Sequence, residues 1–261
     1  MQHPLNNRHV VITGAGRGIG AAIAHTLAQA GAKLTLLGRQ RESLESVAAA
    51  CGGNAFVQAV DISQEEPVQR AIALAVEHWG PVHVLVNNAG QAASQPFEKT
   101  DLALWQQMLD VNLTGTYLCT HAVLPSMKTA AANGTPGRII NIASTAGLKG
   151  YAYVSAYTAA KHGVVGLTRA LALELGSKNI TVNALCPGYT ETDIVKDALS
   201  FIVEKTGKTE TEARARMTAR NPQQRMVQPQ EVAQSVLWLC HPESGAINGQ
   251  AIGIDGGELA G

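Results

Sequence analysis

The sequence predicts an α/β fold in which one parallel β-sheet is covered by helices on both faces. Short β-branched runs alternate with longer Ala- and Leu-rich stretches of helical periodicity, the pattern of repeated strand–helix–strand units. The short runs are apolar almost throughout, as is typical of strands that are buried on both faces of a sheet.

Seven strands and six helices are expected in alternation. The β-branched and apolar runs predict strands at Val10–Thr13, Lys33–Leu37, Ala55–Ala59, His83–Val86, Arg138–Ala143, Thr181–Leu185 and Ala251–Ile254. The periodic stretches predict helices at 18–30, 41–50, 64–79, 101–128, 154–176 and 229–240. Turn residues at Asn133–Gly137 separate the fourth helix from the fifth strand. No internal repeat or linker interrupts the chain, so we expect residues 1–261 to form a single domain.

Composition excludes several classes of function. The formal net charge is zero and the pI is about 7.1, so nothing favours nucleic-acid or membrane-surface binding. The four cysteines are far apart and the eight histidines show no ligand spacing, which argues against a disulfide framework and a catalytic metal. The first strand begins too early for a signal peptide, and no apolar run could span a bilayer. We expect a cytoplasmic protein.

A glycine-rich segment, Thr13–Gly20, follows the first strand and opens into a helix. Glycines permit a tight turn and a close backbone approach to a pyrophosphate, while the helix offers unpaired N–H groups to the phosphates. Such a segment alone could be a mere tight turn, but between a strand and a helix it predicts a dinucleotide site. The residues expected to bind the cofactor here are Gly14, Arg17, Gly18, Ile19 and Gly20.

The end of the second strand bears on the choice of nucleotide. An NAD site usually has a carboxylate there for the ribose hydroxyls, whereas this strand ends in Gly38-Arg39. The planar guanidinium groups of Arg39 and Arg17 suit a 2′-phosphate, because each can grip two phosphate oxygens. NADP(H) is therefore favoured, with NAD(H) as the alternative. The two arginines could instead be solvated surface groups.

The chemical groups expected at the other end of the site are Ser144, Tyr157 and Lys161. On a helix Tyr157 and Lys161 share one face. An ammonium about 5 Å from a phenol, at an effective dielectric of about 20, favours the phenolate by about 3 kcal/mol, or roughly two pKa units, before desolvation opposes it. Lys161 would thus make Tyr157 a usable general acid/base, while Ser144 would hydrogen-bond the substrate oxygen. Tyr and Lys at this spacing also occur by chance in many helices.

Taken together, these motifs resemble the short-chain dehydrogenase/reductase family from about residue 8 to about residue 257. The resemblance is carried by Thr13–Gly20, Asn87–Gly90, Asn112, Ser144, Tyr157 with Lys161, and Pro187-Gly188 followed by Thr192. It implies a Rossmann-type, doubly wound sheet of seven strands. It also implies a catalytic tetrad of Asn112, Ser144, Tyr157 and Lys161, in which Asn112 supports Lys161 through a water-linked proton path.

The resemblance also assigns the remaining cofactor contacts. Asp61, followed by Ile62, would lie beside the adenine, and Asn88, Ala89 and Gly90 would form the floor under the cofactor. Tyr157 and Lys161 would hold the nicotinamide ribose. After the sixth strand, Thr192 and the backbone near Tyr189–Thr190 would hold the carboxamide, and Pro187 and Gly188 would also belong to the cofactor site.

The predicted activity is NADP(H)-dependent hydride transfer between nicotinamide and a ketone or secondary alcohol. Segments Asn221–Arg225, Gln228–Ala233 and Asp255–Gly257 resemble those of β-ketoacyl-thioester and polyketide ketoreductases, which suggests a 3-oxoacyl or 3-hydroxyacyl thioester of coenzyme A or an acyl carrier as substrate. One alternative is an NAD(H)-dependent alcohol or 3-hydroxyacyl dehydrogenase. Another is a non-catalytic dinucleotide-binding regulator.

Two further expectations concern an insert and assembly. Residues 193–220 are expected to form a substrate lid, because apolar residues recur there at helical spacing and Thr209 with Glu212 forms a capping box. That apolar stripe, Ile194, Val195, Ala198, Leu199, Ile202 and Val203, could instead be ordinary core or a subunit contact. Small residues at 152–166 favour a homotetramer, although tight packing on the chain's own sheet would also explain them.

Overall fold

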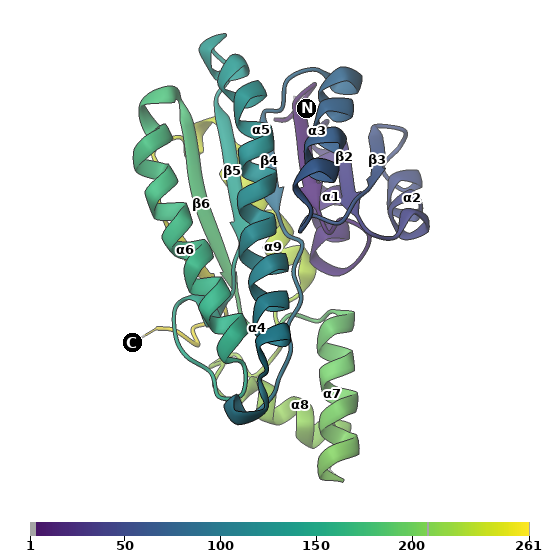
Figure 1. Ribbon diagram of the computed structural model, residues 1–261, viewed down its shortest axis with the longest axis vertical. Helices are drawn as coiled ribbons and strands as arrows, with labels where there is room; N and C mark the ends of the chain where they lie inside the picture. Colours follow the sequence, from purple (N-terminus) through teal and green to yellow (C-terminus); the bar gives the residue numbers. More distant parts are fainter. Residues whose placement is uncertain (1–3, 208, 261) are drawn as a thin grey trace.

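A parallel sheet of seven strands runs through the centre of the molecule (Figure 1). The computed structural model describes residues 4–207 and 209–260. The strands lie in the order β3-β2-β1-β4-β5-β6-β7, and every neighbouring pair is parallel. Their bounds are β1 His9–Thr13, β2 Lys33–Gly38, β3 Ala55–Ala59, β4 Val84–Asn87, β5 Gly137–Ile142, β6 Ile180–Pro187 and β7 Ala251–Ile254.

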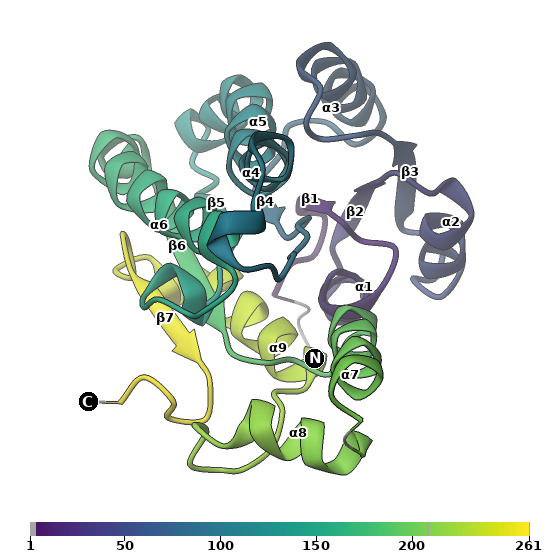
Figure 2. The same ribbon diagram turned by 60° about the horizontal axis from the view of Figure 1, so that its bottom comes forward.

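Helices cover both faces of this sheet (Figure 2). One face carries α1 (Gly18–Gln29), α2 (Arg41–Ala49) and α9 (Pro229–Cys240), whose apolar side chains share a core with the strands. The other face carries α3 (Glu65–Trp79), α5 (Gly115–Ala132) and α6 (Ser155–Leu175), which enclose a second core. The predicted Rossmann-type sheet with helices on both faces is confirmed, and all seven strands lie within a few residues of their predicted positions.

The helix expected at 101–128 differs from the prediction. It consists of α4 (Leu102–Leu109), a π-helical turn at Asp110–Thr114, and α5. The Asn112 side-chain amide donates to the Met108 carbonyl at 2.9 Å, and this is the carbonyl to which the Asn112 backbone N–H would donate in a regular α-helix. A side chain that competes for the helical acceptor explains why the regular helix is interrupted at this residue.

Two helices, α7 (Asp193–Thr206) and α8 (Glu210–Thr218), form the insert between β6 and β7. They project beyond the carboxyl ends of the strands, at the bottom of Figure 1. They pack on each other around a small apolar cluster of Val195, Leu199, Ala213 and Met226. The predicted capping box of Thr209 and Glu212 is present. Of the predicted stripe, the side chains of Ile194, Ala198 and Ile202 lie outside the described part of the structure.

Other features of the described residues concern membranes, metals and thiols. No helix in 4–207 or 209–260 has the length and apolar character needed to cross a membrane. Within the same ranges, no three His, Cys, Asp or Glu side chains gather as ligands of a metal ion would. Cys51, Cys119, Cys186 and Cys240 are free and buried.

Candidate active site

The predicted site residues converge on one edge of the sheet, at the carboxyl ends of the parallel strands. Gly14 follows β1, Arg39 follows β2, Asp61 lies beyond β3, Asn88 follows β4 and Ser144 lies beyond β5. The strand order reverses between β1 and β4, which places the crevice of a doubly wound sheet at this edge.

The glycine-rich turn between β1 and α1 leaves a hollow that side chains would fill. Gly14 has a φ of +64°, and a Cβ there would lie 2.7 Å from the Cα of Ala89. Gly18 has a φ of +54°, and a Cβ there would lie 3.3 Å from Cγ2 of Thr192. A Cβ on Gly20 would overlap the carbonyl oxygen of Gly14. Gly14 and Gly18 therefore favour glycine for their conformation, and Gly14 and Gly20 for lack of space.

The first turn of α1 faces this hollow with unpaired backbone N–H groups. Arg17 is the N-cap residue and its side chain makes no capping hydrogen bond; the first turn holds no acidic residue. Such a helix end attracts anions through its free donors and its dipole. The segment Gly14–Gly20, with Ile19 half-buried in the first turn, therefore fits the pyrophosphate of a dinucleotide.

Asn88 and Thr13 join the start of the β4–α4 segment to this turn. The Asn88 amide donates to the carbonyls of Thr13 at 3.0 Å and Gly14 at 3.1 Å. The Thr13 hydroxyl in turn accepts the N–H groups of Asn88 at 3.0 Å and Ala89 at 2.9 Å. This small network holds the start of the segment Asn88, Ala89 and Gly90, which is expected to form the floor under the cofactor. The part played by Thr13 was not predicted, although it opens the glycine-rich motif.

A cavity of about 400 Å³ lies at the end of the crevice formed by the segments after β2 and β3. Arg39 and Asp61 line it together with Gln91 and residues of α4. The Asp61 carboxylate accepts the N–H of Ser63 at 3.0 Å and its hydroxyl at 2.8 Å, which holds the turn after β3. Ile62 is buried, and its side chain fills the space where Gly115 lacks one.

The two arginines proposed for a 2′-phosphate occupy different places. Arg39 is exposed in the wall of the cavity, and no acidic group among the described residues pairs with it. Arg17 is exposed at the start of α1, and the described lining of the cavity does not include it. Arg39 is thus better placed for the adenosine end of the nucleotide than Arg17.

Ser144, Tyr157 and Lys161 form one connected group. Tyr157 and Lys161 lie one turn apart on α6, and Nζ of Lys161 is 5.7 Å from the centre of the Tyr157 ring. The Tyr157 hydroxyl is hydrogen-bonded to the Ser144 side chain. The Lys161 ammonium donates to the carbonyl of Ile142 at 2.9 Å, which ties it to the end of β5.

Asn112 completes the predicted tetrad from the π-helical turn. Its side chain is fully buried; besides Met108 it donates to the Gln91 carbonyl at 2.9 Å and accepts the Gln91 N–H at 3.3 Å. A Cβ on Gly90 would lie 2.7 Å from Oδ1 of Asn112 and 3.5 Å from Nζ of Lys161. Gly90 therefore lets the Asn112 and Lys161 side chains approach from two sides. The contact with Gln91 was not visible in the sequence, because it depends on the π-helical turn.

The electrostatics of this group differ from the sequence-based expectation. Burial raises the pKa of Tyr157 above its ordinary value, and only the hydrogen bond from Ser144 opposes it. Burial also lowers the pKa of Lys161 from 10.5 to about 8. The sequence-based argument considered the charge of Lys161 before desolvation; in the structure, burial sets the net direction of the Tyr157 pKa, which is upward. Both groups are buried, and desolvation disfavours the charged form of each.

The segment after β6 closes the crevice from the other side. Gly188 donates its N–H to the Ile254 carbonyl at 3.1 Å, directly after Pro187 ends β6. The hydroxyls of Thr190 and Thr192 bond back to the carbonyls of Gly188 at 3.0 Å and Thr190 at 3.2 Å. Thr192 then starts α7 and faces Gly18 of the phosphate turn.

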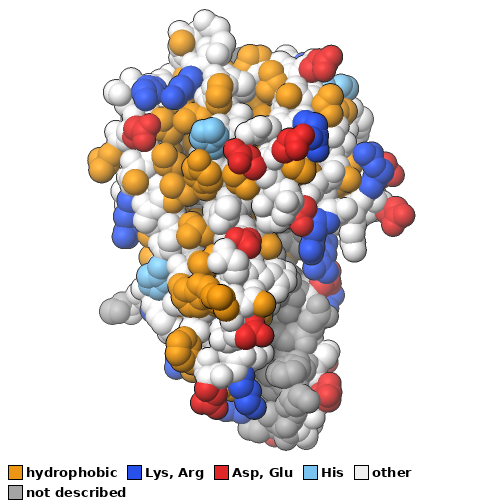
Figure 3. All heavy atoms as spheres, in the orientation of Figure 1, with side chains coloured by type: hydrophobic (Ala, Val, Ile, Leu, Met, Phe, Trp, Pro, Cys, Tyr) orange, Lys and Arg blue, Asp and Glu red, His pale blue; other side chains and the backbone are white. Residues whose placement is uncertain are grey.

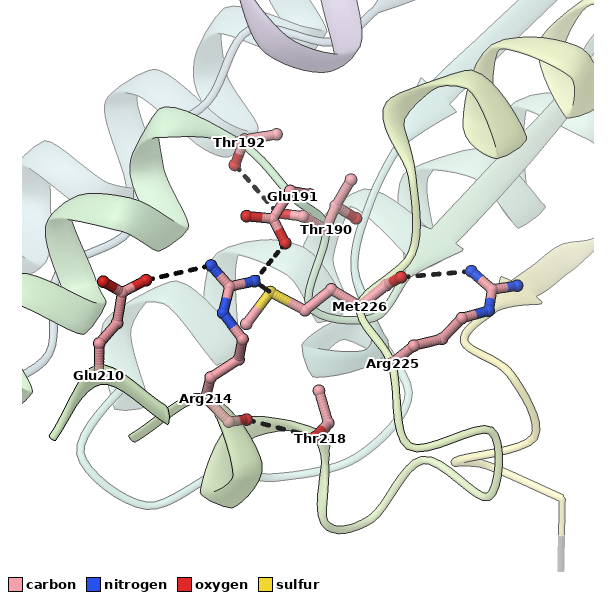
Figure 4. A network of polar contacts seen from close by, with 8 residues as sticks. All are labelled: Thr190, Glu191, Thr192, Glu210, Arg214, Thr218, Arg225 and Met226. Carbon is pink, nitrogen blue, oxygen red and sulfur yellow. Dashed lines mark hydrogen bonds and ion pairs between the residues drawn. The ribbon is translucent and has the colours of Figure 1, made fainter. Parts of the chain in front are cut away.

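An ion pair joins this segment to the insert (Figure 4). Glu191 lies between the two threonines, and its carboxylate accepts a hydrogen bond from Nη1 of Arg214 on α8 at 2.5 Å. The other guanidinium nitrogen, Nη2, lies 3.3 Å from Glu210. A parallel bridge between Thr190 and Val227 adds a backbone connection. The insert is thus linked directly to the strip of chain that borders the crevice.

Comparison with known proteins agrees with this arrangement. Residues 8–201 match the family described as short chain dehydrogenase. A putative ketoacyl reductase of Streptomyces coelicolor is 38% identical over 250 residues, which cover 95% of each chain. An actinorhodin polyketide ketoreductase variant, solved with NADPH, superposes with a TM-score of 0.90 at 37% identity over 96% of this chain and 97% of its own.

A second solved structure holds a different nucleotide. A 3-ketoacyl-(acyl-carrier-protein) reductase from Brucella melitensis, complexed with NADH, gives a TM-score of 0.88 at 33% identity. The alignment covers 97% of this chain and 98% of that one. The chain therefore belongs to the short-chain dehydrogenase family, close to the polyketide ketoreductases, and is an oxidoreductase that acts on the CH–OH/C=O pair.

Proposed function

We propose that this protein is an NADP(H)-dependent ketoreductase. The observation that carries the choice of cofactor is Arg39, which stands at the end of β2 where an NAD site usually has a carboxylate, and lines the cavity beside Asp61. A guanidinium in that place can bind a 2′-phosphate through two parallel hydrogen bonds. The actinorhodin ketoreductase structure with NADPH supports this choice, and the Brucella structure with NADH supports the alternative.

For the substrate we propose a 3-oxoacyl thioester, reduced to the 3-hydroxyacyl thioester. Support comes from the relative named as a ketoacyl reductase and from the solved 3-ketoacyl-(acyl-carrier-protein) reductase. The insert α7–α8 stands over the crevice at the carboxyl ends of the strands, where we propose that it forms a lid for the acyl chain.

Tyr157 supplies the proton in the proposed reduction. Because burial raises its pKa, the phenol is protonated at neutral pH, which is the form that can donate to the oxygen of a ketone. The Ser144 hydroxyl, already bonded to the phenol, would bind the same oxygen and hold the carbonyl against Tyr157. Lys161, with a pKa of about 8, can return a proton toward Tyr157 near neutral pH. When bound, the nicotinamide supplies the hydride, which is the chemistry of the cofactor itself.

The proposal is tested by turnover with NADPH and with NADH at equal concentrations, over a panel of 3-oxoacyl thioesters, cyclic ketones and secondary alcohols. We expect kcat/KM to be larger with NADPH and with thioesters. A wild-type preference for NADH would refute the assignment of Arg39, and cyclic ketones turned over faster than every thioester would refute the substrate class.

A substitution isolates the role of Arg39. Arg39→Asp should lower kcat/KM for NADPH and raise it for NADH, because a carboxylate repels the phosphate and can bind ribose hydroxyls. Arg41→Asp is the matched control, since Arg41 is also exposed, two residues later, but pairs with Glu45 on the surface of α2. We expect Arg41→Asp to leave the cofactor preference unchanged.

We also propose a homotetramer. Of the small residues expected to allow close association, Gly163 packs on Leu113 of its own chain, whereas Gly166 faces open space. Apolar side chains gather over α5 and α6 on the face shown in Figure 3. The exposed large apolar side chains of these two helices are Tyr117 on α5 and Leu173 on α6, among the described residues. This face suits symmetric helix–helix association.

A further inference from the structure

The segment after β7 forms a turn that buries an acidic side chain. Asp255 holds the turn, because its carboxylate accepts the N–H groups of Gly257 at 3.0 Å and Leu259 at 3.1 Å. The side chain of Glu258, on this turn, is only 4% exposed. A buried carboxylate is costly unless it is paired and hydrogen-bonded, so its partners indicate what the turn is built to hold.

Both partners of Glu258 come from the loop that follows Ser144. Its Oε1 lies 3.0 Å from Nζ of Lys149 and 2.7 Å from the hydroxyl of Tyr151. The same hydroxyl lies 2.8 Å from Oγ1 of Thr145. A phenol has one proton and an ionised carboxylate only accepts, so Tyr151 donates to Glu258 and Thr145 donates to Tyr151. A directed chain of hydrogen bonds therefore runs from Thr145 to Glu258.

The opposite side of the same loop rests on α6. A Cβ on Gly147 would lie 2.8 Å from the carbonyl oxygen of Lys161, so only glycine allows the loop to pack this closely on the helix. Within the loop, Ser144 Oγ accepts the N–H of Ala146 at 3.1 Å and caps a short 3₁₀ turn, Thr145–Gly147. The residues that follow Ser144 are thus held between α6 and Glu258.

Glu258 also borders the second wall of the crevice. A Cβ on Gly188 would lie 3.5 Å from Oε2 of Glu258. One carboxylate therefore pairs with the loop after β5, which carries Ser144, and lies beside Gly188 at the start of the strip that carries Thr190 and Thr192. No other described acidic side chain both pairs with the Ser144 loop and approaches Gly188.

We propose that Glu258 is a positioning residue for the reaction: through Tyr151 and Thr145 it fixes the loop that carries Ser144, and so places the Ser144 hydroxyl against Tyr157 and the substrate oxygen. This inference rests on the proposed function, because the placement of Ser144 affects turnover only if Ser144 and Tyr157 act on a carbonyl. It makes the segment after β7 part of the active site.

The test compares Glu258→Ala and Glu258→Gln with the matched control Glu243→Ala, whose carboxylate is exposed on a short turn after α9. Misplacing a reacting group by about 1 Å can cost roughly a hundredfold in rate, so we expect kcat of Glu258→Ala to fall by about tenfold to a hundredfold. The KM for the cofactor should stay unchanged. Glu258→Gln keeps an acceptor for Tyr151 and should lose less, and Glu243→Ala should behave as wild type.

The pH profile separates positioning from general damage. The Ser144 hydrogen bond lowers the pKa of Tyr157, so a displaced Ser144 should leave that pKa higher. In the alcohol-oxidising direction Tyr157 acts as the base, and the acidic limb of kcat should move to higher pH in Glu258→Ala. Tyr151→Phe, which breaks the hydrogen-bond chain but leaves the ion pair with Lys149, should show the same shift; it carries the test if Glu258→Ala does not fold.

The outcomes are distinguishable. A wild-type kcat and pH profile in Glu258→Ala, or in Tyr151→Phe if the first variant does not fold, would overturn the positioning role while leaving the proposed function intact. A wild-type protein that reduces no ketone with either nucleotide would refute the proposed function before any variant is made. A lowered kcat with an unshifted pH profile would also refute the role, because it would show a merely structural effect.

Discussion

Acid should destabilise this protein through one buried histidine, His9, at the start of β1. Its ring is fully buried, with Nδ1 2.8 Å from the Gly80 carbonyl and Nε2 2.9 Å from the Thr35 hydroxyl. A carbonyl only accepts, so the single proton lies on Nδ1 and Nε2 accepts from Thr35. The neutral ring is satisfied, whereas a second proton would point at a hydroxyl that is already donating.

The pKa of His9 is lowered from 6.5 to about 4: burial is the largest cause, the positive charges of His83, His78 and Lys33 act in the same direction, and the hydrogen bond to Gly80 opposes them. Because the folded pKa lies below the unfolded one, the unfolded chain binds more protons between these values, and stability falls as the pH falls. The interval from 6.5 to about 4 corresponds to about 3 kcal/mol of unfolding free energy, present at neutral pH and lost by about pH 4.

Urea unfolding between about pH 4 and pH 7, followed by tryptophan fluorescence at fixed protein concentration, measures this loss. His9→Asn removes the titrating ring, so its unfolding free energy should depend less on pH than that of the wild type. Its stability at neutral pH should also be lower, since Thr35 loses a partner, and the pH slope is therefore the quantity to compare. His121→Asn, at an exposed position on α5, should keep the wild-type slope. Parallel curves for wild type and His9→Asn would refute the reasoning.

Three further predictions address the site, the insert and assembly. Tyr157→Phe should lower kcat by about 10²–10⁴-fold while NADPH still binds, as equilibrium titration would show; near-normal turnover would contradict its role as the acid. Arg214→Gln, which breaks the pair with Glu191, should speed hydrogen exchange in α7 and α8 relative to Arg216→Gln, an exposed neighbour without a described ion pair; identical exchange would show that the pair does not hold the insert. Light scattering at micromolar concentration should give the mass of four subunits, and a monomer mass would rule out the tetramer.

Most of the fold could be predicted because the information is local. Each strand is a short apolar run, and each helix on the sheet repeats its apolar residues at helical spacing, so both element types follow from the sequence pattern. The π-helical turn at Asp110–Thr114 was missed because residues 101–128 keep a helical pattern throughout. A side-chain amide that takes a backbone carbonyl, as Asn112 does with Met108, leaves no periodic signal.

The sequence predicts those features of the site that depend on the spacing of residues along a helix. It does not predict those that depend on how deeply a side chain is buried. Tyr157 and Lys161 lie one turn apart on α6, as their spacing requires. The net direction of the Tyr157 pKa could not be predicted, because the spacing of Tyr157 and Lys161 carries no information on the burial that raises this pKa. Glu258 contacts Lys149 and Tyr151, which lie more than a hundred residues earlier in the chain. No local sequence motif indicates such a contact.

The π-helical turn has a consequence for which mutations the chain can accept. A π-turn holds one residue more than the matching α-helical turn, and one residue is about 100° of helical rotation. The face of α4 that lies on α6 and the face of α5 that lies on α3 are therefore in register only while that residue is present. Deleting a single residue at 110–114 would rotate all of α4 against α5 and turn the buried Met108 away from its packing. We expect this stretch to accept no change of length.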